Sequence, residues 1–328
     1  MSAGSYRLCG AATGLLLMLA AAAPLAGPQM AVAALHLCAI AIAAAAFGLS
    51  SGPSGPACLS HAIFVTLGMA GVAAFPGAAG AAAGMAAAVV PPGGLSAALR
   101  RFGRGAWALA SLAAAVLAAP HLPVSPAALP ELPMPAGGPM LPVPDLARLP
   151  ALLRGEAGAA DLIAARPLTG QMAGAWLLLG LAVLLLLVLR RLRLSAFGAA
   201  LEGVRASPAR MAATGYRPDW LRAGALCLSA GLAAAAGAIL ALAGPGPASA
   251  QGLPLLAQIL LVAVIGGAGP VRFAVLAAAL VIAGRALAVA LVPQAGILQA
   301  PGVELLCWGL FLGLAAGLPR PGARRAAG

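Results

Sequence analysis

The chain contains no lysine and little charge of either sign. Its 328 residues include 19 basic residues, all of them arginine, and 7 acidic ones, and charged residues make up 8% of the sequence. Soluble domains carry about 25% charged residues. A Walker A loop needs a lysine to hold the phosphates of a nucleotide. The sequence therefore excludes ATP hydrolysis by a Walker A site in this chain and predicts a polytopic membrane protein.

Cysteine and histidine are scarce and scattered. No C-x-x-C pair and no H-E-x-x-H motif occurs among the five cysteines and three histidines. Most of the cysteines lie in apolar runs, where free cysteine behaves as a small hydrophobic residue. We therefore predict no metal site, no cofactor and no catalytic residue, and we expect that the chain is not an enzyme.

Apolar runs long enough to cross a bilayer follow one another along the chain. Hydrophobic residues make up 62% of the sequence, and a spanning helix needs about 20 mainly apolar residues. The sequence predicts an all-α, polytopic membrane helix bundle with about ten transmembrane helices in a single domain, residues 1–328. The predicted spans lie near 8–25, 30–49, 60–76, 77–92, 105–120, 171–189, 223–243, 252–268, 273–292 and 302–318.

The first apolar run can be interpreted in two ways. It ends in AAAPLAG, which resembles the cleavage site of a signal peptide. Another span follows almost at once, and an even number of spans places both termini on one side of the membrane. Arg7 and the tail RPGARRAAG are both basic, which indicates the cytoplasmic side. We therefore favour a retained first helix with both termini in the cytoplasm.

Arginines cluster between the spans, and this accounts for the net charge of +12 without nucleic-acid binding. Residues 190–222 hold seven arginines and two acids, whereas residues 120–166 hold four acids and three arginines. Cytoplasmic loops carry an excess of basic residues. We predict a cytoplasmic segment at 190–222 and a proline-rich, extended or loosely packed periplasmic loop at 120–170. That loop serves either as a spacer or as a docking surface for a partner.

The cytoplasmic segment contains the signals of a short helix. Ser207 and Pro208 form an N-cap and first-turn pair, and Gly215 ends the helix after about two turns. Such a helix suits an element that receives force from a partner. It equally suits a surface helix held by anionic lipid headgroups. These features alone leave both interpretations open.

The sequence of this segment also resembles a known family. The stretch is FGAALEGVRASPARMAATGYRPDWLRAG, residues 197–224. It resembles the permease subunits of ABC importers for branched-chain amino acids. The matching positions are Phe197, Gly198, Ala200, Leu201, Val204, Arg205, Ser207 and Gly215. Ala199 and Ala206 depart from the family pattern. The resemblance implies a coupling segment for partner ATPases at 190–222. The residues that we expect to serve the coupling are Glu202, Arg205, Ser207, Arg210 and Gly215.

Two further stretches resemble the same family. The first is GPSGPACLSHAIF, residues 52–64, where prolines and glycines interrupt an apolar run. The second is ILLVAVIGGAGP, residues 259–270, which retains the family glycines at 266, 267 and 269. For Gly266, Gly267 and Gly269 we expect a turn or packing role.

The interruption predicts a broken or re-entrant segment near 50–61. Irregular backbone at membrane depth is tolerated where it is buried in protein or lines a watery cavity. We expect Ser60 to cap a helix that begins at His61. We place the substrate pathway at Gly55, Ser60, His61, Phe64 and Thr66. The alternative is a plain turn between helices, in which His61 anchors the chain at the headgroups.

The resemblance implies a transmembrane permease subunit in the bacterial inner membrane, nearer to the LivM-type subunit than to the LivH-type or urea permeases. The implied partners are two cytoplasmic ABC ATPase subunits, a second permease subunit, a periplasmic substrate-binding protein and membrane lipid. The implied substrate is a branched-chain amino acid or a similar small polar solute, such as urea or an amide, moved by alternating access. The alternative is a secondary transporter driven by an ion gradient, for which Glu304 is nearly the only membrane carboxylate.

Overall fold

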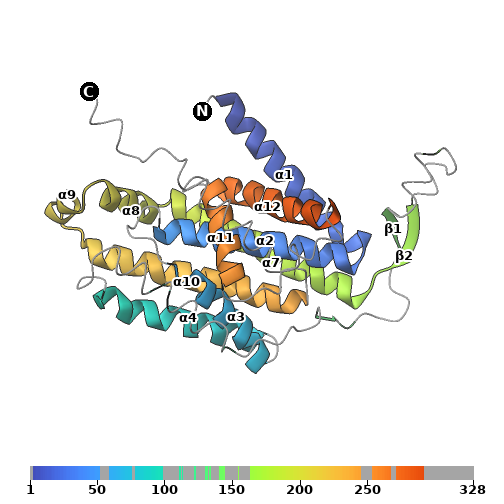
Figure 1. Cartoon of the computed structure of the whole chain (residues 1–328), viewed down its shortest axis with the longest axis horizontal. Helices are drawn as coiled ribbons and strands as arrows, with labels where there is room; N and C mark the ends of the chain where they lie inside the picture. The colour runs from blue at the N-terminus through green and yellow to red at the C-terminus, as the bar shows by residue number, and fades with distance from the viewer. Residues whose placement is uncertain are drawn as a thin grey trace.

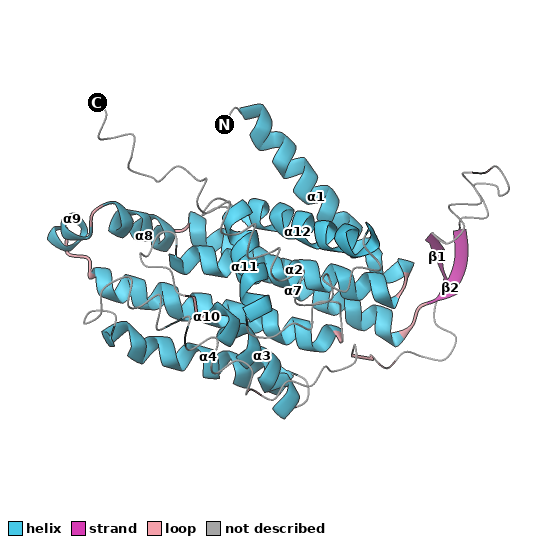
Figure 2. Ribbon diagram, in the orientation of Figure 1, coloured by secondary structure: helices cyan, strands magenta, loops and turns pink. Residues whose placement is uncertain are grey.

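The fold is a helix bundle in the part of the chain that the structure describes. A computed structural model describes residues 3–51, 59–75, 78–98, 163–244, 253–266 and 271–291, together with 140–144 and single positions between 111 and 154. Figure 2 shows that almost all of these residues are helical, with one two-stranded sheet outside the bundle. The prediction of an all-α membrane helix bundle is confirmed for these ranges.

The described elements follow the predicted spans closely. The helices are α1 (Ala3–Ala26), α2 (Pro28–Ser51), α3 (His61–Ala74), α4 (Ala78–Ala98), α7 (Gly170–Leu194), α8 (Ala196–Ala206), α9 (Pro208–Ala213), α10 (Pro218–Ala243), α11 (Leu253–Gly266) and α12 (Val271–Leu291). Eight of the ten predicted spans coincide with one of these helices. The other two, 105–120 and 302–318, lie outside the described residues apart from Ser111 and Ala113.

Four of the described helices are long and apolar enough to cross a membrane. Their apolar windows are Cys9–Ala26, Pro28–Ser51, Gly170–Leu194 and Pro218–Ala243. Shorter apolar helices occupy His61–Ala74, Ala78–Val90, Pro254–Gly266 and Val271–Gly284. These short helices lie close to the long ones, since α3 and α4 pack against α10, and α11 and α12 pack against α2.

The centre of the bundle is formed by α2 and α10. Buried residues make up 72% of the α2 window and 83% of the α10 window, against 22% for α1 and 39% for α7. Both central helices are rich in alanine, whose small side chain lets neighbouring backbones approach on every side. By these buried shares α2 and α10 lie inside the bundle and α7 is more exposed, and α1 stands at the edge (Figure 1).

Glycines set the closest approach in the bundle, between α3 and α10. A Cβ at Gly68 would overlap the carbonyl oxygen of Ala234, and a Cβ at Gly237 would overlap the carbonyl oxygen of Val65. Each helix therefore offers a glycine to the backbone of the other. Only glycine leaves enough room at such a contact.

The segments predicted to be cytoplasmic and periplasmic lie at opposite ends of the bundle (Figure 1). At one end are α8 and α9. At the other, β1 (Met140–Pro144) pairs antiparallel with β2 (Ile163–Pro167), and the side chain of Gln171 donates a hydrogen bond of 2.6 Å to Glu131. The side of the membrane that each end faces stays a prediction.

Candidate functional site

A buried histidine joins three helices in the centre of the bundle. His61, the first residue of α3, is fully buried, and its Nε2 lies 2.6 Å from the Oγ of Ser229 on α10. The Ser229 hydroxyl donates to the carbonyl oxygen of Ala46 on α2 at 2.7 Å. Because the hydroxyl proton is used there, Nε2 of His61 acts as the donor to Ser229. This arrangement links α2, α3 and α10 through polar groups inside an apolar core.

The surroundings of the imidazole fix its orientation. Ser50 on α2 places its Oγ 3.5 Å from Nε2 of His61 and donates to the carbonyl oxygen of Phe47. The rings of Phe47 and Phe64 pack edge-on against the imidazole, with centroid distances of 5.2 and 5.5 Å. Edge-to-face packing of this kind is favourable between rings. The histidine is therefore held by hydroxyl groups and by two aromatic rings.

The structure brings together only part of the predicted substrate pathway. His61 and Phe64 are in contact, whereas Gly55 lies outside the described residues. Thr66 is buried, but its hydroxyl donates to the carbonyl oxygen of Ile63 on the same helix at 2.9 Å. That hydroxyl is therefore engaged within α3.

The prediction for Ser60 is right about the helix start and wrong about the cap. The helix begins at His61, but the side chain of Ser60 makes no capping hydrogen bond. An N-cap residue normally has an extended backbone, which aims its side chain at the free amides of the first turn. Ser60 instead has φ −79° and ψ 6°. Its carbonyl oxygen accepts from the amides of Ile63 and Phe64.

Sequence reasoning did not place Ser50, Phe47 or Ser229 at the site. Ser229 lies 168 residues beyond His61 in the chain. The one available signal is a lone hydroxyl in an apolar run, since Ser and Thr in membrane helices commonly hydrogen-bond across to a neighbouring helix. That signal predicts that Ser229 forms a hydrogen bond to a neighbouring helix, but it does not predict which residue is the partner.

The predicted short helix between two spans is confirmed as α9. The hydroxyl oxygen of Ser207 accepts a hydrogen bond of 3.3 Å from the amide of Arg210, as an N-cap does. Gly215 follows the helix with φ +89°, a conformation that favours glycine. Both ends of α9 are therefore set by the residues that the sequence singles out.

The outer surface of α8 and α9 is open and charged. One face of α8 is buried through Gly198, Leu201 and Val204. Glu202 and Arg205 flank this buried stripe; their side chains are 58% and 47% exposed and form an ion pair at 3.7 Å. No residue of α9 is buried. The buried residues of α8 thus attach it to the bundle, and α9, which follows it in the chain, is accessible at the end of the bundle.

The glycine stretch after α11 lies at a close helix contact. Gly266 ends α11, and a Cβ there would lie 3.1 Å from the carbonyl oxygen of Phe273 and 3.2 Å from the backbone of Ala274 on α12. This agrees with the expected packing role for Gly266. Gly267 and Gly269 lie outside the described residues.

Comparison with known proteins matches the second half of the chain to a family model. The model is described as "Branched-chain amino acid transport system / permease component" and matches residues 148–314, about half of the chain. The matched range includes all helices from α7 to α12 and the Ser229 side of the histidine site. No curated protein and no solved structure matches the chain.

Proposed function

The chain belongs to the family of permease components of branched-chain amino acid transport systems, and on this premise we propose that it is the transmembrane subunit of an ABC importer. The proposed complex contains two cytoplasmic ATPase subunits, a second permease subunit and a periplasmic substrate-binding protein. The chain would be a LivM-type subunit of the bacterial inner membrane with both termini in the cytoplasm. Its substrate would be a branched-chain amino acid or a similar small polar solute.

The observation that carries the importer proposal is the construction of α8 and α9. An element that transmits force needs an accessible surface and a rigid attachment. The ion pair of Glu202 and Arg205 on α8 is exposed and no residue of α9 is buried, while Leu201 and Val204 of α8 are fully buried. The segment also lies within the range that matches the family.

A path from this segment to the buried histidine runs through α10. The turn after α9 leads directly into α10 at Pro218, and α10 carries Ser229 to His61. We propose that closure of the ATPases moves α8 and α9 and shifts α10 against α3. During alternating access the contact between His61 and Ser229 would switch between two arrangements. Substrate would pass beside this contact.

The first experiment identifies the partners. The tagged chain is expressed in its native host, extracted in mild detergent and analysed for co-purifying proteins by mass spectrometry. The proposal expects a nucleotide-binding ATPase and a second permease. If the chain purifies alone even after crosslinking, and takes up solute in liposomes with an ion gradient and no ATPase, the secondary-transporter alternative replaces the importer.

The second experiment tests the coupling role of α8. Removing the Glu202–Arg205 pair by a double alanine substitution should lower ATP-driven uptake at least about tenfold in proteoliposomes, while the complex still hydrolyses ATP. Exposed ion pairs stabilise a fold by only about 0–1 kcal/mol, so the variant should remain folded. The reason for the expected loss is that both side chains are exposed at the end of the bundle where we propose that the ATPase docks.

The chain offers a matched control for this variant. Asp219 and Arg222 form a similar ion pair with the same spacing at the start of α10, at 3.9 Å. Their double alanine substitution removes the same charges from the far end of the predicted coupling segment, away from the residues expected to serve the coupling. Uptake should fall much less than in the α8 variant. Normal uptake by the Glu202/Arg205 variant, or an equal loss in both variants, would refute the coupling role.

A further inference from the structure

A cavity outside the histidine site lies between α1, α7 and α12, with a volume of about 790 Å³. Each of these helices lines it with residues of one face. On α1 these are Gly10, Thr13, Gly14 and Leu17, which recur with helical spacing. The volume falls within the range of about 300–1,000 Å³ that is typical of ligand sites. The cavity is therefore a structured space that α1 helps to enclose.

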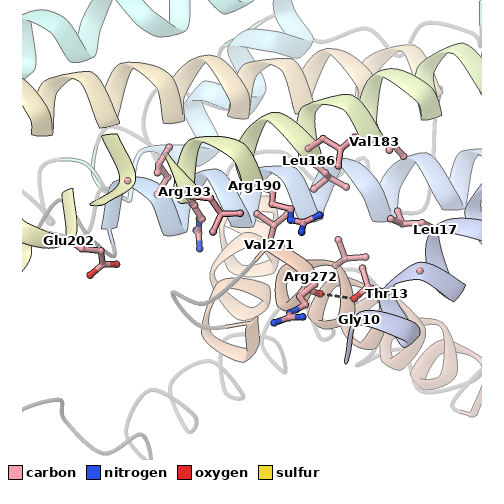
Figure 3. A pocket seen from close by; sticks show the side chains of 16 residues that line it. Gly10, Thr13, Leu17, Val183, Leu186, Arg190, Arg193, Glu202, Val271 and Arg272 are labelled. Carbon is pink, nitrogen blue, oxygen red and sulfur yellow. Dashed lines mark hydrogen bonds between the residues drawn. The ribbon is translucent and has the colours of Figure 1, made fainter. Parts of the chain in front are cut away.

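Positive charge gathers around this cavity. Arg190 and Arg193 of α7 and Arg272 of α12 line it, and Glu202 is the only acid among its described lining residues. Among the lining residues that the structure describes, three cations and one anion leave a net charge of +2. Figure 3 shows Arg190 and Arg193 extending from α7 toward the side where Arg272 and Thr13 lie. The lining therefore complements an anion.

Backbone contacts anchor the side chain of Arg193 at this cavity. Arg193 donates to the carbonyl oxygen of Ala45 at 3.0 Å, and Gly48 leaves the room that its guanidinium occupies. The hydroxyl of Thr13 donates to the carbonyl oxygen of Cys9 on its own helix at 2.8 Å and lies 3.5 Å from the backbone oxygen of Arg272 at the start of α12. Arg193 thus supports the fold directly, so Arg190 and Arg272 are the better residues to test.

The remainder of the cavity wall is apolar and long. Leu17, Val183, Leu186, Leu187 and Val275 continue the lining. On α7 the whole lining runs from Val183 to Leu194, about 16 Å of helix, with the apolar residues Val183 and Leu187 toward one end and the arginines toward the other. That length is close to half of a hydrocarbon core of about 30 Å, which corresponds to one leaflet. The arginines stand at the end of α7 where the predicted span ends.

From this combination we infer that the cavity binds an anionic phospholipid of the leaflet that faces α8, with its phosphate between Arg190 and Arg272 and an acyl chain along the apolar wall of α7. A soluble phosphate compound would use the arginines but would leave the apolar lining residues Leu17, Val183 and Leu187 without a partner. Basic pockets between membrane helices are known to hold anionic lipid headgroups. The inference concerns the isolated permease and does not depend on the importer proposal.

The test uses the full chain, purified in detergent with any subunits that accompany it and then stripped of lipid. Phosphatidylglycerol, phosphatidylcholine and inorganic phosphate are the three probes. Bound lipid is counted by native mass spectrometry, and the shift in melting temperature is followed during titration. We expect phosphatidylglycerol to bind and raise the melting temperature, and the other two probes to do so much less.

Two arginine variants locate the site. Each arginine near an anionic headgroup changes the affinity about fivefold, so Arg190→Gln with Arg272→Gln should weaken phosphatidylglycerol binding about 25-fold. The control is Arg191→Gln with Arg217→Gln, which removes two exposed arginines that do not line the cavity. The control should bind as the wild type does. Equal binding by both double variants, or equal loss in both, would overturn the inference.

A second pair of variants tests the cavity without changing charge. Gly14 lines the cavity, and a Cβ there would meet open space, so Gly14→Phe should place a ring in the path of a bound acyl chain without disturbing the backbone. Gly180 on α7 has the same open surroundings but does not line the cavity. Gly14→Phe should abolish lipid binding, and Gly180→Phe should retain it. Undiminished binding to Gly14→Phe, or equal stabilisation by inorganic phosphate, would refute a lipid in this cavity.

Discussion

Replacing Gly237 by alanine should separate α3 from α10 and break the hydrogen bond between His61 and Ser229. An alanine Cβ at this position would lie 2.8 Å from the carbonyl carbon of Val65 and closer still to its oxygen, whereas ordinary contact begins at 3.4 Å. The two helices must therefore move apart by about 1 Å to relieve the overlap. The same movement would lengthen the distance from Nε2 of His61 to Oγ of Ser229 from 2.6 Å to about 3.6 Å, which is no longer a hydrogen bond.

The magnitude follows from three contributions. Overpacking a close contact costs about 1–3 kcal/mol. The lost interhelical hydrogen bond costs about 0.6 kcal/mol and at most about 1.7 kcal/mol in a membrane protein. Alanine offsets up to about 1 kcal/mol of this, because it is a better helix former than glycine. We expect the free energy of unfolding to fall by about 2 kcal/mol.

The assay is reversible unfolding of the purified chain in detergent, followed by circular dichroism. Gly180→Ala is the control, because a Cβ at Gly180 meets open space and the substitution should be neutral or slightly stabilising. A double-mutant cycle with Ser229→Ala adds a second readout. If Gly237→Ala already breaks the hydrogen bond to His61, then Ser229→Ala should cost less in that background than in the wild type, because only its bond to Ala46 is left to lose. Equal stability of the two glycine variants, or an unchanged cost of Ser229→Ala, would refute the reasoning.

Two further predictions concern the ends of the bundle. Ser207→Ala removes the hydroxyl that accepts from the amide of Arg210, which should destabilise α9 by about 1 kcal/mol and speed hydrogen exchange there about fivefold; unchanged exchange in 208–213 would contradict the cap. Trp176→Phe removes the hydrogen bond of 2.9 Å from the indole to the carbonyl oxygen of Ala21, which ties α7 to the weakly buried α1. Exchange in α1 should rise while exchange in α10 stays unchanged, and equal rises in both helices would indicate general destabilisation instead.

Local features of the sequence were sufficient for the helices and for the ends of several of them. A spanning helix is recognised by its length and apolar composition alone, so the spans at 30–49, 171–189 and 223–243 coincide with α2, α7 and α10. The cap of α9 at Ser207 and its stop at Gly215 are also local, because each depends on a few neighbouring residues. The capping bond expected at Ser60 is missing, and local sequence could not predict this. Whether the side chain caps the helix depends on the backbone angles of Ser60, which its residue type does not determine.

The faces of these helices could not be predicted. A helix that is apolar all round has no amphipathic pattern from which its buried face can be read. For that reason the sequence did not indicate that α2 and α10 occupy the centre, or that α1 and α7 are more exposed. It also did not indicate which glycine meets which backbone, because that depends on how two helices cross.

The sequence by itself determined the membrane class of this protein, its helices, the absence of a Walker A site and the short charged helix between two spans. Each of these follows from composition or from residues close together in the chain. Only the tertiary structure decided that Ser229 meets His61 and that Arg190 and Arg272 share one cavity. Those contacts join residues more than 80 positions apart, and they depend on the packing of small side chains, which sets how closely and at what rotation the helices meet.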